Sequence, residues 1–117
     1  MAPLSKHIAT NLGSAKALCK MAADGVSTQY ESNISSVTDN GAGDVSISFS
    51  DAFSSSHYIP LTCVNTILAN NNANDSFSMH QITSSSAMRV VSAYSGTVAN
   101  VTYNDWEKFA SAHGDLA

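Results

Sequence analysis

Apolar and polar positions alternate most clearly over residues 45–50, where Val45, Ile47 and Phe49 are each followed by a serine. A period of two places the apolar side chains on one face and the hydroxyls on the other, which is typical of a half-buried strand in an antiparallel sheet. Just before it, residues 38–44 contain an Asn-Gly step and a second glycine. Glycine and asparagine supply the positive φ values of a tight turn, so the sequence predicts a β-hairpin here.

The remainder of the chain repeats this short-strand pattern. Apolar or alternating segments recur at a spacing of roughly ten residues, which is typical of a β-sandwich or barrel. Gly-, Ser- or Asn-rich turns separate them, including turns at 84–86 and 95–96. Pro60 cannot donate to a strand ladder, so it places its end of the strand at a sheet edge or bulge. The segments predicted as strands are 15–22, 26–30, 34–38, 44–50, 57–68, 77–81, 88–93 and 98–103.

This pattern predicts one all-β domain. We expect an antiparallel β-sandwich or jelly-roll-like domain of about eight short strands over residues 15–117. Residues 1–14 lack a strand pattern and are expected to form an N-terminal arm or a short helix. The arm has no apolar core or cleavage site of the kind that marks a secretory signal.

Composition narrows the possible functions. Only 12% of the residues are charged, the net charge is −4, and the five basic residues are scattered, so we expect no nucleic-acid partner. No apolar run approaches the ~20 residues needed to span a bilayer, so we expect no membrane insertion. The two cysteines, Cys19 and Cys63, are interpreted as free buried thiols rather than a disulfide.

One segment resembles a known module. Residues 15–58 read AKALCKMAADGVSTQYESNISSVTDNGAGDVSISFSDAFSSSHY, and SSVTDNGAGD occupies 35–44. This segment resembles a β module of bacteriophage tail-fibre proteins. Leu18 and Met21 stand where that module usually has Trp and Phe, and both remain apolar. The resemblance implies a virion structural protein, assembled in the cytoplasm of a bacterial host, with threefold symmetry.

The C-terminal segment leaves two structures open. Trp106 and Phe109 are three residues apart, as on one turn of a helix. The tail-fibre module instead ends in a strand, and residues 109–115 loosely match that ending. We favour the strand.

No catalytic, metal or cofactor site is predicted. The four histidines are far apart in the sequence, and none lies near a cysteine or an acid at the spacing of metal ligands. Asp39 and Asp44 flank the hairpin turn. We expect Asp39 to bond the turn backbone and Asp44 to begin the next strand, rather than to act as a glycosidase pair. The protein is therefore expected to work by binding and not as an enzyme.

Exposed tyrosines beside Asn and Ser would form a surface suited to glycans, because rings stack on sugar faces while amides bond hydroxyls. Loops on a rigid β frame are the usual place for such a surface. The alternative is that most of the tyrosines pack at sheet edges. The candidate binding residues are Asn70, Asn71, Asn72, Asn74 and Asp75 in one loop, His57 and Tyr58 in a second, and Tyr94 near a third.

Two functions remain open from the sequence. The first is a homotrimeric tail-fibre-type protein that binds a host receptor, with Met21, Ile47 or Phe49 packing across the threefold axis. The second is a capsid decoration or cement protein that braces the head. In either case residues 1–14 are expected to contact other virion proteins.

Overall fold

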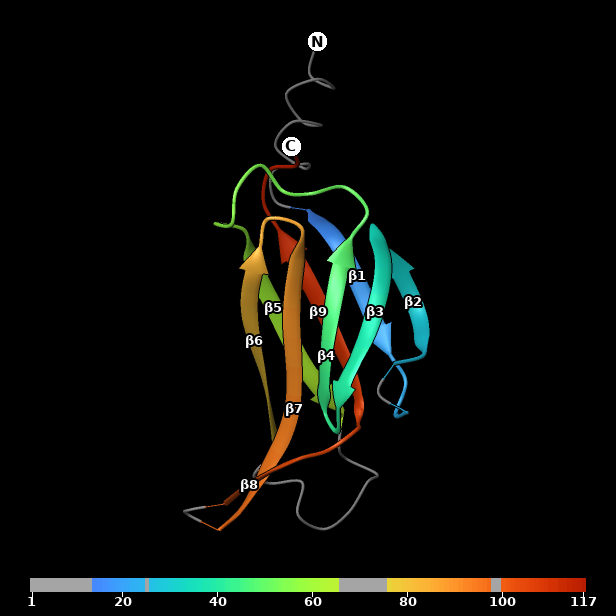
Figure 1. The fold of residues 1–117 in the computed structure, drawn as a ribbon, viewed down its shortest axis with the longest axis vertical. Coiled ribbons are helices and arrows are strands. Elements are labelled where there is room, and N and C mark those ends of the chain that lie inside the picture. The colour runs from blue at the N-terminus through green and yellow to red at the C-terminus, as the bar shows by residue number, and fades with distance from the viewer. Residues whose placement is uncertain (1–13, 25, 66–75, 98–99) are drawn as a thin grey trace.

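The structure, a computed structural model, describes residues 14–24, 26–65, 76–97 and 100–117. They form two antiparallel sheets that pack face to face as a β-sandwich, as the sequence predicted (Figure 1). The predicted N-terminal arm falls almost wholly outside these residues, and so does the Asn70–Asp75 loop. The strands are β1 (Ala15–Met21), β2 (Thr28–Ser32), β3 (Ile34–Gly41), β4 (Asp44–Phe49), β5 (Ile59–Asn65), β6 (Ser76–Ser84), β7 (Ala87–Thr97), β8 (Asn100–Tyr103) and β9 (Glu107–His113).

Each sheet mixes strands from both halves of the chain. Sheet I has the order β2-β1-β9-β5, and sheet II has the order β3-β4-β7-β6, with β8 pairing to β7. The chain passes from sheet I to sheet II at Asn33, which has a positive φ of 58°. The Asn33 side chain donates to the Lys16 carbonyl at 3.0 Å and accepts from the Asp51 amide at 2.7 Å. This crossing point is therefore held by side-chain bonds to β1 of sheet I and to the segment that follows β4 of sheet II.

The core lies between the sheets and follows the alternation read from the sequence. Val45, Ile47 and Phe49 of β4 all point inward and are at most 6% exposed. Met21 of β1 is also fully buried in this core. The expectation that Met21, Ile47 or Phe49 packs across a threefold axis is therefore wrong, because these side chains already fill the interior of a single chain.

The predicted turn at 95–96 is wrong. Strand β7 continues through both residues to Thr97, and β8 pairs alongside it, with Ala93 opposite Tyr103 and Ser95 opposite Val101. Earlier along β7 the same edge pairs with β4, from Ala87 to Val91. The long strand β7 thus pairs with β4 and then with β8 along one edge. This pairing overrides the local preference of Ser95 and Gly96 for a turn.

The C-terminal segment is a strand, as favoured, and not a helical turn. Strand β9 lies between β1 and β5, so it is central in sheet I. Its residues Lys108, Ala110 and Ala112 alternate toward the core. Strand β5 is the edge of the sheet, which confirms the edge position predicted from Pro60.

Both cysteines are free thiols, as interpreted from the sequence. Cys19 is buried at 1% exposure, because it faces inward on β1. Cys63 is exposed, because it lies on the outward face of the edge strand β5. The predicted burial is therefore correct for Cys19 and wrong for Cys63.

Candidate functional site

The candidate binding residues within the described part of the chain do not form one site. His57 is exposed, but Tyr58 is only 4% exposed, with its ring stacked on Phe53 at 4.5 Å. The Tyr58 hydroxyl donates to the carbonyl of Ala87, the first residue of β7. Tyr94 is half-buried beside Trp106 and lies seven residues further along that strand, roughly 23 Å away at strand rise. The Tyr58 ring is therefore unavailable for stacking, and the two tyrosines cannot contact one small ligand.

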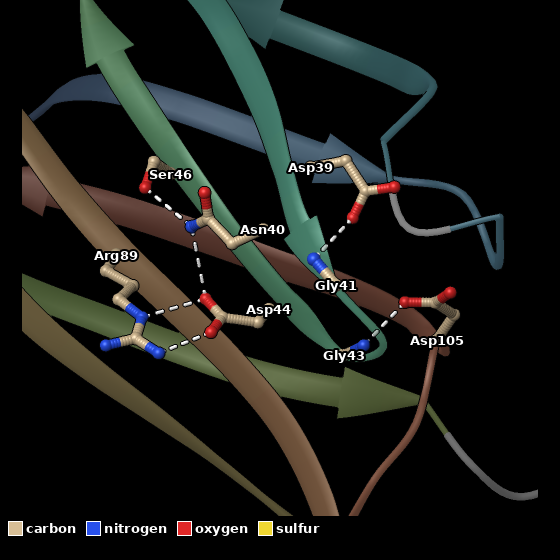
Figure 2. Close-up of polar contacts among 8 residues, drawn as sticks. All are labelled: Asp39, Asn40, Gly41, Gly43, Asp44, Ser46, Arg89 and Asp105. Atoms are coloured by element: carbon tan, nitrogen blue, oxygen red, sulfur yellow. Dashed lines mark hydrogen bonds and ion pairs between the residues drawn. The ribbon is translucent and has the colours of Figure 1, made fainter.

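A different set of polar side chains gathers on the outer face of sheet II, near the tip of the β3–β4 hairpin (Figure 2). Arg89 of β7 forms a two-pronged ion pair with Asp44 of β4, in which Nε lies 2.8 Å from Oδ1 and Nη2 contacts Oδ2. Asn40 donates through Nδ2 to Asp44 Oδ1 at 3.2 Å and to Ser46 Oγ at 2.7 Å. We call Arg89, Asp44, Asn40 and Ser46 the Arg89 cluster.

Electrostatics within the Arg89 cluster fix its charge state. The hydrogen bond from Arg89 holds the pKa of Asp44 below its ordinary value, and the Asn40 bond and the positive charges of Arg89 and Lys108 act in the same direction. Asp44 is therefore ionised at neutral pH, and its charge compensates that of Arg89. Such paired, hydrogen-bonded charges hold each other in a defined geometry.

The hairpin tip is fixed by turn chemistry and by a contact from the far end of the chain. The amide of Gly41 donates to Asp39 Oδ1 at 2.9 Å, and Asp44 is the first residue of β4, so both aspartates have the predicted hairpin roles. The amide of Gly43 donates to Asp105 Oδ1 at 2.6 Å (Figure 2). The carbonyl of Gly43 accepts from the Ser92 amide at 2.8 Å. The tip is therefore tied to both β7 and the segment before β9.

A buried lysine lies beneath this tip. Lys108 is 1% exposed and donates from Nζ to Ser92 Oγ at 3.3 Å. Burial lowers the pKa of Lys108, and the charges of Asp105, Asp39 and Asp44 oppose that change. The lysine is enclosed, so its positive charge favours the ionised form of Asp44 from inside and is not accessible to a ligand.

A shallow groove of about 220 Å³ adjoins the Arg89 cluster on the same outer face. Tyr103 and Met79 are 51% and 42% exposed, which places an aromatic ring and a flexible apolar side chain at its surface. The groove is lined by Met79, His80, Gln81, Arg89, Val91 and Tyr103. Apolar surface beside a few fixed polar groups is the usual composition of a small-ligand site.

A second groove, of about 200 Å³, contains the predicted residue His57. Phe53 and Tyr58 also line it, but their rings are 2% and 4% exposed. Its described lining therefore offers the polar side chains of two serines, His57 and Asp115, without an accessible aromatic face. The groove beside the Arg89 cluster is the better candidate for recognising a ligand with both apolar and hydroxyl groups.

The sequence reasoning missed Arg89, Gln81 and Met79 as site residues. Arg89 and Gln81 lie directly opposite each other on β7 and β6, and the strand alternation places both on an outer face. That alternation was a usable signal for exposure. It did not reveal that Asp44, 45 residues earlier in the chain, pairs with Arg89.

Comparison with known proteins gives no relative: no family model matches the chain, and no curated protein or solved structure matches it. Among the described residues, no group of three or more His, Cys, Asp or Glu side chains is placed to hold a metal ion. Within the same ranges, no helix has the length and apolar character needed to cross a membrane.

Proposed function

We propose that this protein is a phage virion structural protein of tail-fibre type, a homotrimeric β domain on the virion surface that binds a host-surface glycan and catalyses no reaction. The resemblance of residues 15–58 to the tail-fibre module supports the virion assignment. The observation that carries the binding role is the groove in which the exposed Tyr103 ring lies beside the Arg89–Asp44 pair. An aromatic ring can cover the apolar face of a sugar while the remaining N–H groups of Arg89 and the amide of Gln81 bond its hydroxyls.

An apolar row on sheet I supports self-association. Ile59 and Leu61 of β5 are 63% and 55% exposed, and Cys63 follows them on the same outward face. Half-buried Phe109 lies directly opposite Cys63 on β9. Contiguous exposed apolar side chains mark protein contacts more often than solvent surface. The trimer contact in this proposal uses the outer face of sheet I and leaves the groove on sheet II open.

The binding role is tested with purified protein on host cells and on their isolated surface polysaccharide. We expect saturable binding to both, competed by the free polysaccharide, and no release of reducing sugar. Failure to bind either would contradict the receptor role, and measured turnover would contradict the non-enzymatic role.

The self-association is tested by sedimentation equilibrium of the wild type and of Leu61→Asp. We expect a trimer that dissociates in the variant, because a carboxylate would be buried without a partner in the contact. Val101→Asp is the matched control, since Val101 is 50% exposed on β8 of sheet II. A trimer that survives Leu61→Asp would rule out this face as the contact.

A capsid decoration or cement protein is the second candidate function, and the same apolar row favours it, because that row also suits docking on a head lattice. Counting copies of the protein in purified virions separates the two candidates. Hundreds of copies would indicate head decoration, whereas a few trimers would indicate a fibre or another tail component.

A further inference from the structure

We infer that the groove on sheet II binds an uncharged sugar ring, a neutral pyranose unit of a polysaccharide, rather than an acidic sugar or a phosphate. This inference rests on the proposed glycan-binding function and identifies the chemical class of its ligand. It follows from the charge state of the Arg89 cluster, from the exposed apolar surface of the groove and from its size.

Charge compensation disfavours an anionic ligand. Among the described residues that line the groove, the basic side chains are Arg89 and His80, and Asp44 already accepts hydrogen bonds from two N–H groups of Arg89. A ligand carboxylate or phosphate would compete with Asp44 for the guanidinium and would lie beside a carboxylate of the same charge. The negative charges of the ligand and of Asp44 would repel each other at this close range, so an anion would gain little binding energy from Arg89.

The same pair suits hydroxyl groups. A guanidinium has five N–H donors, so three lie beyond the two that Asp44 accepts (Figure 2). The Gln81 amide adds an acceptor to the groove, and Gln81 lies directly opposite Arg89 on the adjacent strand. Neighbouring hydroxyls of a sugar both donate and accept, so they match a surface that presents both kinds of group side by side.

The apolar part of the groove suits the C–H face of a pyranose. Tyr103 provides a half-exposed ring, Met79 a flexible apolar side chain, and Val91 a floor that is only 8% exposed. A tyrosine combines an apolar body with a polar tip, which suits an amphipathic ligand. The floor and ring together exclude water from one face of the sugar.

The size of the groove limits it to a short part of the polysaccharide. Its 220 Å³ lies below the ~300–1,000 Å³ of typical pockets for drug-sized ligands. We therefore expect a weak single-site affinity, with a dissociation constant of about 1 mM. Several copies on one trimer would raise the apparent affinity for a repeating polymer through multivalency.

The test is an NMR titration of the purified protein with four probes: methyl glucoside, methyl galactoside, methyl mannoside and methyl glucuronide. We expect at least one neutral glycoside to shift the amide signals of β6, β7 and β8, and the glucuronide to shift them less at equal concentration. Tyr103→Ala should weaken binding of the neutral glycoside about tenfold, whereas Tyr103→Phe should retain it. Tyr30→Ala is the matched control, because Tyr30 is 60% exposed on β2 of sheet I.

A variant that neutralises Asp44 tests whether charge compensation of Arg89 disfavours an acidic sugar. Asp44→Asn removes the compensating charge from Arg89, so binding of glucuronide should rise relative to neutral glycoside. If this variant does not fold, Gln81→Ala provides the second test, with an expected loss of neutral-glycoside binding and no gain for glucuronide.

The outcomes separate this inference from the proposed function. Preferential binding of glucuronide by the wild type would overturn the neutral-sugar inference and leave glycan binding intact. Neutral binding that is insensitive to Tyr103→Ala would place the sugar elsewhere on the protein. Failure of every saccharide, including the host polysaccharide, would overturn the proposed function itself.

Discussion

The amide of Gly43 donates a 2.6 Å hydrogen bond to the carboxylate of Asp105, which joins the β3–β4 hairpin tip to the segment before β9 (Figure 2). Gly43 has a φ of 66°, and its carbonyl accepts from Ser92 on β7. A single glycine thus connects three segments that are distant in sequence. The arrangement holds Asp44, the next residue, in place beside Arg89.

Replacing Gly43 with alanine should destabilise the fold strongly. The added Cβ would lie 2.4 Å from the Ser92 carbonyl oxygen and 2.6 Å from the Asn104 nitrogen, and the positive φ adds backbone strain. We expect a loss of roughly 3 kcal/mol in the free energy of unfolding, measured by urea titration. Gly41→Ala is the control, because Gly41 also has a positive φ but no atom within 4 Å of the added Cβ. Equal losses in the two variants would contradict the role given to close packing.

Removing the Asp105 carboxylate should weaken the same junction without a steric clash. Asp105→Ala leaves the part-buried Gly43 amide without its acceptor, and we expect a loss of about 1–3 kcal/mol in unfolding free energy. Asp105→Asn keeps an acceptor oxygen and should lose less. Hydrogen exchange of the Gly43 amide gives a local readout, and it should accelerate in the alanine variant. Unchanged exchange would show that the bond does not protect the tip.

Lys108 should make the protein less stable than a neutral side chain would. Burial lowers the pKa of Lys108 from 10.5, so between the lowered value and 10.5 the unfolded chain binds more protons than the folded chain. Stability from this group therefore rises with pH across that window. We expect Lys108→Met to gain on the order of 1 kcal/mol at neutral pH, and the gain to shrink toward pH 10.5. Urea titrations of both proteins across this range test the trend, and a pH-independent difference would contradict it.

The contribution of Cys19 to the free energy of unfolding should have the opposite pH dependence to that of Lys108. Burial, assisted by the charge of Glu31, raises the pKa of Cys19 from 9.0 to about 11. Its contribution is fully present below pH 9 and is lost as the pH rises toward about 11, because the unfolded chain ionises first. The free energy of unfolding of the wild type should therefore fall relative to that of Cys19→Ala over this range. Burial also raises the pKa of Tyr58 to about 12. The contributions of Tyr58 and Lys108 are the same in both proteins and cancel in the difference, so a constant difference would show that the thiol does not titrate as described.

Much of the fold was predictable because its signals are local. The alternation over 45–50, the hairpin within 38–44 and the acceptor role of Asp39 each depend on residues within one hairpin, although the turn itself is formed by Ala42 and Gly43 and the Asn-Gly step lies at the end of β3. Pro60 indicated an edge strand because it lacks an amide hydrogen. These features follow from backbone geometry, and the structure confirms each of them.

The features that were missed depend on contacts between distant segments. The Ser-Gly pair at 95–96 reads as a turn, but pairing with β8 keeps it extended. Tyr58 has a polar tip, yet its ring is buried against Phe53 and its hydroxyl bonds Ala87. The Arg89–Asp44 pair joins neighbouring strands of sheet II. No local pattern reports which strands become neighbours, so the candidate site emerged only from the fold.

The continuity of β7 has a mechanical consequence. This strand pairs with β6 along one edge and with β4 and then β8 along the other. Ladder hydrogen bonds run perpendicular to the strands, so a pull on a ligand held near β8, directed along β7, loads many of them together in shear. Strands loaded in shear resist rupture better than a hairpin whose hydrogen bonds open one at a time. Gly43 bonds Ser92 at the point where the edge of β7 changes its partner from β4 to β8, so it joins the two loaded regions.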